Sequence, residues 1–241
     1  MVRLLETRGI SKRFGGLVAV DNLDLHVEKE EVLGFIGPNG AGKTTAFNLV
    51  MGALPQDSGD VLLNGININD CPTHERVKRG IARTYQVTRP LKGWTLSENI
   101  RLSMIPDGLK SLKETVSYED AIKQIAEETG LTEQLHSYPD ELPIGALRRL
   151  EIARAFANNP KVILIDEAFA GLTPHEIDFM LGLLRRKKKE GMSFVIIDHN
   201  LEVLSKAVDR VLVIHLGRKL AEGSFKEITE NETVKKAYLG E

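Results

Sequence analysis

Apolar and polar residues alternate along the first thirty residues in the manner of β-strands. The clearest stretch is AVDNLDLHV, at residues 19–27. Its main apolar positions are Val20, Leu23, Leu25 and Val27. A short apolar run, EVLGFIG, follows at residues 31–37 and leads through a glycine-rich loop into the helix-like KTTAFNLVMGAL. A strand, a glycine-rich loop and a helix in this order are half of a parallel α/β unit.

The pattern changes between residues 90 and 150. Segments such as YEDAIKQIAEETG and LRRLEIARAFA carry apolar residues at helical spacing, without β-branched runs. Three buried-strand runs, KVILID, SFVIID and RVLVIHLG, then alternate with helical segments, as in a parallel sheet covered on both faces. We therefore predict one α/β domain over residues 1–241. Its mostly parallel core and an antiparallel β subdomain lie in 1–89 and 151–241, and an inserted helical subdomain lies in 90–150.

Composition and charge limit the cellular compartments and the classes of partner that are possible for this protein. The formal net charge of −2 does not indicate a nucleic-acid binder, so we expect no nucleic-acid partner. The single cysteine, Cys71, excludes an internal disulfide and a thiol cluster for a metal. No apolar stretch approaches the roughly 18 residues that cross a bilayer, and the N-terminus lacks the apolar core of a signal peptide. These features predict a soluble protein in a reducing compartment.

The segment GPNGAGKT matches the phosphate-binding pattern G-x-x-x-x-G-K-[ST] between a predicted strand and a predicted helix. In such a loop the backbone N–H groups and the helix N-terminus face phosphate oxygens. We expect Lys43 to reach the β- and γ-phosphates and Thr44 to ligate Mg²⁺. The predicted nucleotide contacts here are Gly37, Pro38, Asn39, Gly40, Ala41, Gly42, Lys43, Thr44 and Thr45.

A second candidate site is VILIDE, an apolar run that ends in two carboxylates. At the tip of a buried strand, Asp166 is expected to hold Mg²⁺, directly or through water. Glu167 is then expected to orient and polarise the attacking water as a general base. An acidic pair at a strand end is by itself more often a surface feature or a helix cap. The phosphate loop in the same chain favours the catalytic interpretation.

The phosphate loop, LIDEAFAGLTPHE and IDHN, in this order, resemble an ATPase subunit of an ABC transporter, and the resemblance covers essentially the whole chain. It implies the ABC-type fold of the P-loop NTPases, with ATP and Mg²⁺ as cofactors. It further implies that Gln86 contacts Mg²⁺ and takes part in catalysis, that His199 contacts the γ-phosphate, and that Lys43 belongs to the catalytic set. Phe14 is expected to stack on adenine, with Val20 among the cofactor contacts.

The chain is most similar to ATP-binding subunits of branched-chain amino-acid importers, a resemblance carried by SKRFGGLVAVDNLDLHV, RGIARTYQ, LRRLEIARAF, AEGS and the closing AYLG. Urea and amide importers share this pattern. The resemblance implies a cytoplasmic ATPase that is peripheral on the inner face of the cell membrane. Its expected partners are a second ATPase subunit, transmembrane permease subunits and, indirectly, a periplasmic or extracellular solute-binding protein.

The family signature, Leu-Ser-Gly-Gly-Gln, is altered in this chain to Leu142-Pro143-Ile144-Gly145-Ala146. In a dimer of such subunits, the signature of one covers the γ-phosphate held by the other. Pro143 provides neither a hydroxyl nor an N–H group for that contact, whereas Gly145 still allows close approach across the dimer. We therefore favour a heterodimer with an ATPase that has an intact signature, and a homodimer stays possible.

Two alternatives belong to other functional classes. A soluble ABC ATPase in translation or repair is disfavoured. Translation factors of this type carry two cassettes in one chain and repair proteins carry long coiled-coil insertions, and this sequence shows neither feature. A nucleotide-gated structural module with little turnover is disfavoured by Glu167, whose general-base role is typical of an active hydrolase.

Overall fold

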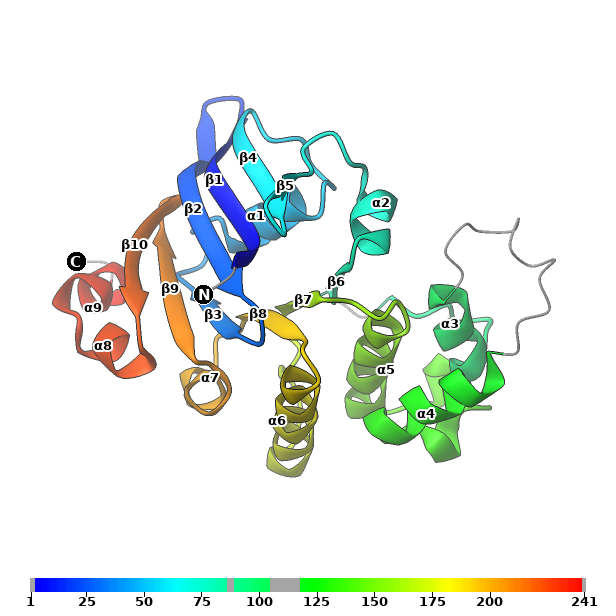
Figure 1. Ribbon diagram of the computed structural model, residues 1–241. Helices are drawn as coiled ribbons and strands as arrows, with labels where there is room; N and C mark the ends of the chain where they lie inside the picture. Colours follow the sequence, from blue (N-terminus) through cyan, green and yellow to red (C-terminus); the bar gives the residue numbers. More distant parts are fainter. Residues whose placement is uncertain (1–2, 86–88, 105–117, 240–241) are drawn as a thin grey trace.

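The protein is built from two β-sheets and a separate group of helices (Figure 1). The computed structural model describes residues 3–85, 89–104 and 118–239. The larger sheet has the order β10-β9-β3-β8-β7-β6, and only β10 and β9 are antiparallel to each other. Its strands are β3 (Val32–Ile36), β6 (Ile81–Arg83), β7 (Val162–Asp166), β8 (Ser193–Ile197), β9 (Arg210–His215) and β10 (Arg218–Gly223).

The smaller sheet is antiparallel and has the order β2-β1-β4-β5. Its strands are β1 (Arg3–Phe14), β2 (Leu17–Glu28), β4 (Ser58–Leu63) and β5 (Ile66–Asn67). Near it lie α1 (Lys43–Val50) and α2 (Thr73–Lys78), as Figure 1 shows. The remaining helices of the core are α6 (Pro174–Lys189), α7 (Leu201–Ala207), α8 (Phe225–Glu230) and α9 (Glu232–Leu239).

Strands of the larger sheet are apolar on both faces because each face packs against a different layer. On β7, Val162 and Leu164 belong to the cluster shared with α1 and the antiparallel sheet. Their neighbours Ile163 and Ile165 belong to the cluster shared with α6 and α7. Successive side chains of a strand point to opposite faces, so a strand buried between two layers reads as a continuous apolar run.

A third hydrophobic cluster holds the helical group together, to one side of the sheets in Figure 1. Its elements are α3 (Leu96–Ser103), α4 (Glu119–Thr129), two short 3₁₀ turns (Thr132–Gln134 and Pro139–Glu141) and α5 (Ile144–Phe156). Helix α5 contributes Leu150 to this cluster and Phe156 to that of the core. The expected boundary at residue 150 thus falls inside a helix that both parts share.

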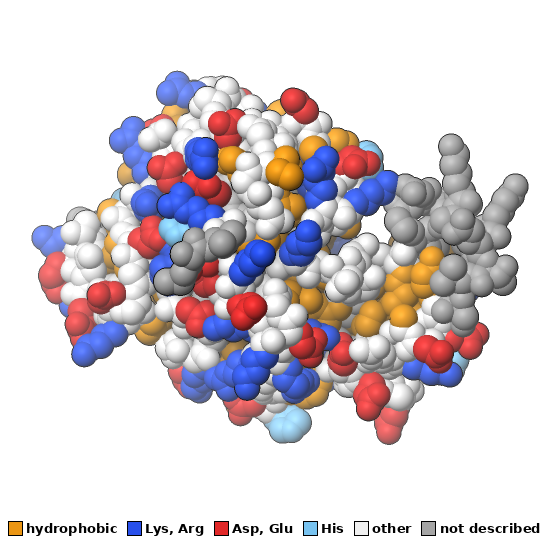
Figure 2. Space-filling model, viewed as in Figure 1, with side chains coloured by type: hydrophobic (Ala, Val, Ile, Leu, Met, Phe, Trp, Pro, Cys, Tyr) orange, Lys and Arg blue, Asp and Glu red, His pale blue; other side chains and the backbone are white. Residues whose placement is uncertain are grey.

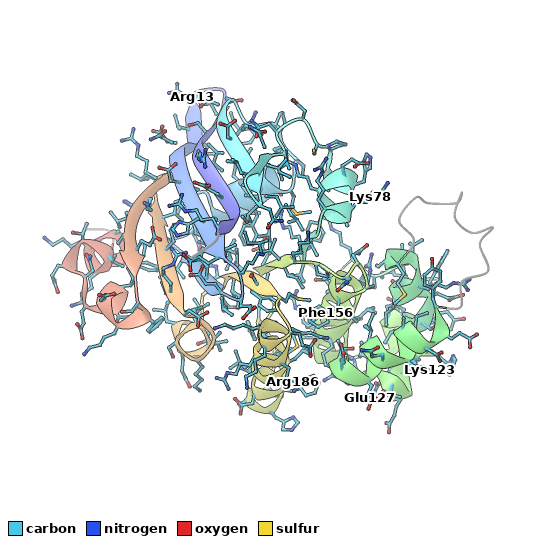
Figure 3. The ribbon with its side chains drawn as sticks, in the orientation of Figure 1. Arg13, Lys78, Lys123, Glu127, Phe156 and Arg186 are labelled. Atoms are coloured by element: carbon cyan, nitrogen blue, oxygen red, sulfur yellow. The ribbon has the colours of Figure 1, made fainter. Side chains whose placement is uncertain are left out.

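Side chains of α4 and α5 show how the helical group meets the core. In Figure 3, Lys123 and Glu127 lie at the outer face of α4, and Phe156 lies on the side of α5 that is turned toward α6. The Nζ atom of Lys187 in α6 lies 5.5 Å from the centre of the Phe156 ring. The same Nζ pairs with Glu128 Oε2 of α4 at 2.8 Å, so one lysine of α6 contacts both α4 and α5.

These observations confirm the predicted fold class, an α/β core with a mostly parallel sheet, an antiparallel β subdomain and added helices. On the face drawn in Figure 2, acidic and basic side chains are interspersed, and hydrophobic side chains gather around α3 and α5. No helix within residues 3–85, 89–104 and 118–239 has the length and apolar character needed to cross a membrane.

Arg76 joins α2 to the end of α1 and is 1% exposed. Its guanidinium donates to the carbonyl oxygens of Leu49 and Val50 at 2.9 and 2.7 Å, and to those of Asn69 and Cys71 at 3.0 and 2.8 Å. The last carbonyls of a helix lack partners within the helix, so Arg76 caps α1. Burial lowers the pKa of Arg76.

Replacing Arg76 with methionine is expected to lower the free energy of unfolding by about 3 kcal/mol, because buried carbonyls lose charge-assisted hydrogen bonds. Urea unfolding followed by circular dichroism measures this change. The control is Arg79→Met, which removes an exposed arginine three residues later. Equal urea midpoints for the two variants would show that the hydrogen bonds of Arg76 to the end of α1 contribute nothing to stability.

Candidate nucleotide-binding site

The predicted site residues follow neighbouring strands of the larger sheet. Strands β3, β8 and β7 lie side by side and parallel, so their carboxyl ends reach the same edge. The phosphate loop follows β3, His199 follows β8, and Asp166 and Glu167 lie at the end of β7. Ligands of α/β proteins bind at this edge of the sheet.

A cleft of about 620 Å³ opens at this edge. The predicted residues that line it are Phe14, Asn39, Gly40, Ala41, Gly42, Lys43, Thr44, Thr45, Glu167 and His199. Leu17, Val18 and Ala19 of the β1–β2 hairpin complete the wall beside Phe14. The structure therefore brings together a phosphate loop, an acid, a histidine and an exposed aromatic ring around one space.

The phosphate loop depends on glycine for its shape. Gly42 has a φ of +104°, and a Cβ atom there would lie 2.2 Å from the carbonyl oxygen of Ala19. Only glycine combines this backbone conformation with such a close approach. Helix α1 begins directly after it, so the loop and the helix N-terminus present backbone N–H groups toward the cleft.

Lys43 folds back onto its own loop. The side chain is buried, and Nζ donates to the carbonyl oxygens of Gly37 at 2.6 Å and Pro38 at 3.0 Å. Burial lowers the pKa of Lys43, while the carboxylates of Glu167 and Asp166 act in the opposite direction. Gly37 and Pro38 thus contribute carbonyl groups that hold the lysine, and neither residue is part of the cleft lining.

Glu167 and His199 form a pair at the cleft. The Oε1 atom of Glu167 lies 2.8 Å from Nε2 of His199, and the glutamate side chain is 17% exposed. The backbone of Glu167 has a φ of +51°, and its N–H donates to the carbonyl of Ile197 at 2.8 Å. A left-handed conformation costs a non-glycine residue about 1–2 kcal/mol. Such strain is often found at functional sites.

Asp166 lies behind the cleft lining, with 2% of its surface exposed. Its Oδ2 atom accepts a hydrogen bond from Nη2 of Arg83 at 2.8 Å, and both side chains are buried. The hydroxyl of Thr84 accepts the backbone N–H of Asp166 at 3.2 Å. The carboxylate is therefore held on one side by a cation from the neighbouring strand β6.

The donors at this edge suit Mg²⁺ that arrives with a nucleotide. Thr44 offers a hydroxyl and Asp166 a carboxylate, and hard cations prefer oxygen ligands. Among the described residues there is no group of three or more His, Cys, Asp or Glu side chains that could hold a metal. A magnesium ion here would therefore take most of its ligands from phosphates and water.

Phe14 and Val20 differ in their surroundings. Phe14 is 46% exposed, and Nζ of Lys12 lies 5.9 Å from the centre of its ring. Val20 is completely buried, because its side chain packs under the phosphate loop against Gly42. Its side chain is absent from the lining of the cleft, where Val18 and Ala19 are present instead.

The altered signature lies at the N-terminus of α5. Pro143 is the residue before the first turn, and Ile144 is 58% exposed. Gly145 is buried, and a Cβ atom there would lie 1.8 Å from Oε1 of Glu176 in α6, so a larger residue would displace Glu176. The contact of Gly145 with a partner's nucleotide stays a prediction.

Gln86 lies outside the described residues, but its described neighbours are held by α5. Glu151 accepts the backbone N–H groups of Tyr85 at 3.3 Å and of Arg89 at 3.2 Å. Burial raises the pKa of Glu151. Arg154 donates to the carbonyl of Arg89 at 3.0 Å. The helix that begins with the signature thus binds the chain on both sides of Gln86.

The sequence did not reveal two residues near the site. Arg83 is the first residue of RTYQ. The sequence feature that could have indicated its role is a charged residue at the end of an apolar, strand-like run. Tyr238 belongs to the closing AYLG, and the backbone of Gly37 acts to lower the pKa of its hydroxyl. Partial burial raises the pKa of Tyr238 to about 12.

Comparison with known proteins identifies the family. Residues 20–170 match the family model described as ABC transporter. The chain belongs to the ABC transporter family. Residues 218–241 match a second model, described as branched-chain amino acid ATP-binding cassette transporter. ATP hydrolysis is the activity of this family, and the predictions of family and activity are confirmed.

Relatives of similar length cover almost the whole chain. The high-affinity branched-chain amino acid transport ATP-binding protein BraF of Pseudomonas aeruginosa is 36% identical over 99% of this chain and 98% of its own. LivG of Escherichia coli, a protein with the same description, is 34% identical over 99% and 98%. The lipopolysaccharide export system ATP-binding protein LptB of Escherichia coli is 33% identical over 98% and 97%.

Solved structures agree with this assignment. A nucleotide-free ATP-binding cassette from an ABC transporter superposes with a TM-score of 0.89 at 32% identity, covering 99% of this chain and 100% of the other. A cassette of an ABC transporter in its ADP conformation gives a TM-score of 0.88 at 32% identity, with 100% of both chains covered.

Proposed function

We propose that this chain is the ATP-hydrolysing subunit of an importer for branched-chain or related amino acids. The match of residues 218–241 to the branched-chain amino acid model supports this substrate class, together with similarity to BraF and LivG along the whole chain. In this proposal the subunit is peripheral on the inner face of the cell membrane. It acts with permease subunits and, through them, with a solute-binding protein.

In the proposed reaction, the phosphate loop binds ATP and Lys43 leaves the carbonyls of Gly37 and Pro38 to contact the β- and γ-phosphates. Phe14 stacks on the adenine. Thr44, Asp166 and Gln86 would hold Mg²⁺, which would neutralise phosphate charge. Glu167 accepts a proton from the attacking water, and His199, 2.8 Å from Glu167, stabilises the γ-phosphate.

Uptake by whole cells tests the substrate class. Deleting the gene in its host is expected to abolish high-affinity uptake of labelled leucine, and the wild-type chain is expected to restore it, whereas Glu167→Gln is not. The tagged chain should co-purify with a membrane permease. If leucine uptake is unchanged while the chain co-purifies with a different membrane complex, the substrate assignment is wrong.

Lipopolysaccharide export is a second candidate, because LptB is nearly as similar to this chain as LivG is. The same deletion separates the two, since an exporter subunit would leave leucine uptake intact and alter the cell envelope. The C-terminal match to the branched-chain amino acid model favours import.

We further propose that the subunit works in a heterodimer, because Pro143 and Ile144 weaken its signature. A proline at the start of α5 has no N–H group, and the exposed Ile144 side chain occupies space where the family has glycine. The N-terminus of α5 would still face a partner's γ-phosphate, and Gly145, which is buried against Glu176 in this structure, would contact it only after Glu176 moves aside. In this arrangement the chain's own nucleotide is covered by the intact signature of the partner.

Restoring the signature is expected to produce a homodimer. With MgATP, Glu167→Gln alone should remain a monomer by light scattering, whereas the same chain with Pro143→Ser and Ile144→Gly should dimerise. Each regained charge-assisted hydrogen bond stabilises the closed dimer by about 1.5–3 kcal/mol. The control is the restored chain with ADP, which has no γ-phosphate to clamp. If Glu167→Gln alone dimerises just as tightly, the proposed need for a different partner subunit is wrong.

A further inference from the structure

The buried ion pair between Arg83 and Asp166 joins the proposed magnesium site to strand β6. The exposed fractions of the two side chains are 4% and 3%, and the distance between Arg83 Nη2 and Asp166 Oδ2 is 2.8 Å. Removing one partner of a buried ion pair leaves the other charge buried and uncompensated, which is strongly destabilising, so the two side chains depend on each other.

Arg83 also binds the helix that follows the phosphate loop. Its Nη1 atom donates to Oδ1 of Asn48 at 2.5 Å, and Asn48 lies four residues after Thr44 on α1. The guanidinium carbon lies 5.5 Å from the ring centre of Phe47 and 5.0 Å from that of Tyr85. Two fixed hydrogen bonds and two rings give the guanidinium a defined position beside Asp166.

We propose that Arg83 is a positioning residue that acts as the resident counter-cation of Asp166 and sets how strongly nucleotide binding depends on Mg²⁺. The inference rests on the proposed role of Asp166 at the metal site. Arg83 neutralises Asp166 before Mg²⁺ arrives and keeps its Oδ2 atom in a fixed orientation. In the loaded site Asp166 would face both Arg83 and Mg²⁺, so the positive charge of Arg83 would weaken the attraction between Asp166 and Mg²⁺.

Binding of a fluorescent ADP in the presence of either Mg²⁺ or EDTA tests this role. The readout is the magnesium ratio, defined as the Kd in EDTA divided by the Kd in Mg²⁺. Arg83→Gln keeps a donor near Asp166 but removes the charge, so its ratio is expected to rise about tenfold. Arg83→Lys keeps the charge and should stay close to the wild type. The control is Arg8→Gln, which removes an arginine paired with Glu6 in the antiparallel sheet.

A ratio that Arg83→Gln leaves unchanged would overturn the proposal, provided that Asp166→Asn lowers the ratio. If Asp166→Asn has no effect on the ratio, the metal-site assignment itself is wrong. These two outcomes separate a failure of the inference from a failure of the proposed function. A purely structural role for Arg83 would affect the binding of ADP equally in Mg²⁺ and in EDTA.

Thermal unfolding in EDTA provides the second test, which applies even where Arg83→Gln alone does not fold. Asp166→Asn leaves the Arg83 cation buried without its anion, whereas Arg83→Gln/Asp166→Asn places two neutral amides there. The double variant is therefore expected to melt at a higher temperature than Asp166→Asn. A double variant that melts at a lower temperature would show that the two side chains do not act as a pair.

Discussion

Replacing Glu167 with glutamine is expected to lower kcat for ATP hydrolysis by about 10²–10⁴-fold, the usual contribution of a general base. Glutamine has nearly the same shape and can still hydrogen-bond with His199, so the cleft should keep its form. It cannot accept a proton from water, and this is the property that the reaction requires. Binding of MgATP is expected to stay close to that of the parent.

The measurement is the steady-state ATPase rate of the assembled transporter, together with the Kd of a fluorescent ATP analogue. Glu202→Gln is the matched control, because Glu202 follows His199 by three residues but is exposed and paired with Lys206 at 2.7 Å. Its rate should equal that of the parent. Hydrolysis by Glu167→Gln at the parental rate would show that another group activates the water.

The strained backbone at Glu167 supports the same assignment. Its left-handed conformation places the side chain beside His199, where an extended strand would continue in another direction. The backbone hydrogen bond from Glu167 to the carbonyl of Ile197 fixes this turn to the neighbouring strand β8. The two strands that carry the acid and the histidine are thus locked together directly at the proposed reaction centre.

Much of the fold could be predicted from local pattern. The runs KVILID and SFVIID became β7 and β8 because both faces of the sheet are covered, and the phosphate loop follows β3 because its glycines permit the turn. The order of the strands in the sheet was not predictable from the pattern. It results from which strands pack between α1 and α6, and this is a property of the whole chain.

Side-chain partners were less accessible to sequence reasoning. The pairing of Arg83 with Asp166 joins residues 83 positions apart, and no spacing rule predicts it. Arg76 is similar, because its four carbonyl acceptors become neighbours only after folding. Val20 was predicted to contact the nucleotide but is buried under the phosphate loop. Alternation along a strand predicts which side chains share a face, but it does not predict which of them a loop covers.

Replacing Lys43 with methionine is expected to weaken ATP binding by at least about 10²-fold, since one or two charge-assisted hydrogen bonds of about 1.5–3 kcal/mol each are lost. Methionine matches the length of the aliphatic part of lysine, so the buried position stays filled. The carbonyls of Gly37 and Pro38, which Nζ now satisfies, would lose a donor. The melting temperature without nucleotide should also fall, because the hydrogen bond from Lys43 to the carbonyl of Gly37 is buried and its loss leaves that acceptor unsatisfied.

Calorimetric titration with MgATP measures the affinity. A parallel titration with adenosine shows whether the lost affinity comes from the contacts with the phosphates. A nucleoside without phosphates should bind the variant and the parent equally, because Phe14 and the hairpin beside it are unchanged. Lys235→Met is the control for loss of a charge, since Lys235 is exposed on α9 and pairs with Glu232 in the same helix. If Lys43→Met and Lys235→Met bind MgATP with equal affinity, Lys43 does not leave the carbonyls of Gly37 and Pro38 to bind phosphate when the nucleotide arrives. The lysine would then serve only to hold the loop.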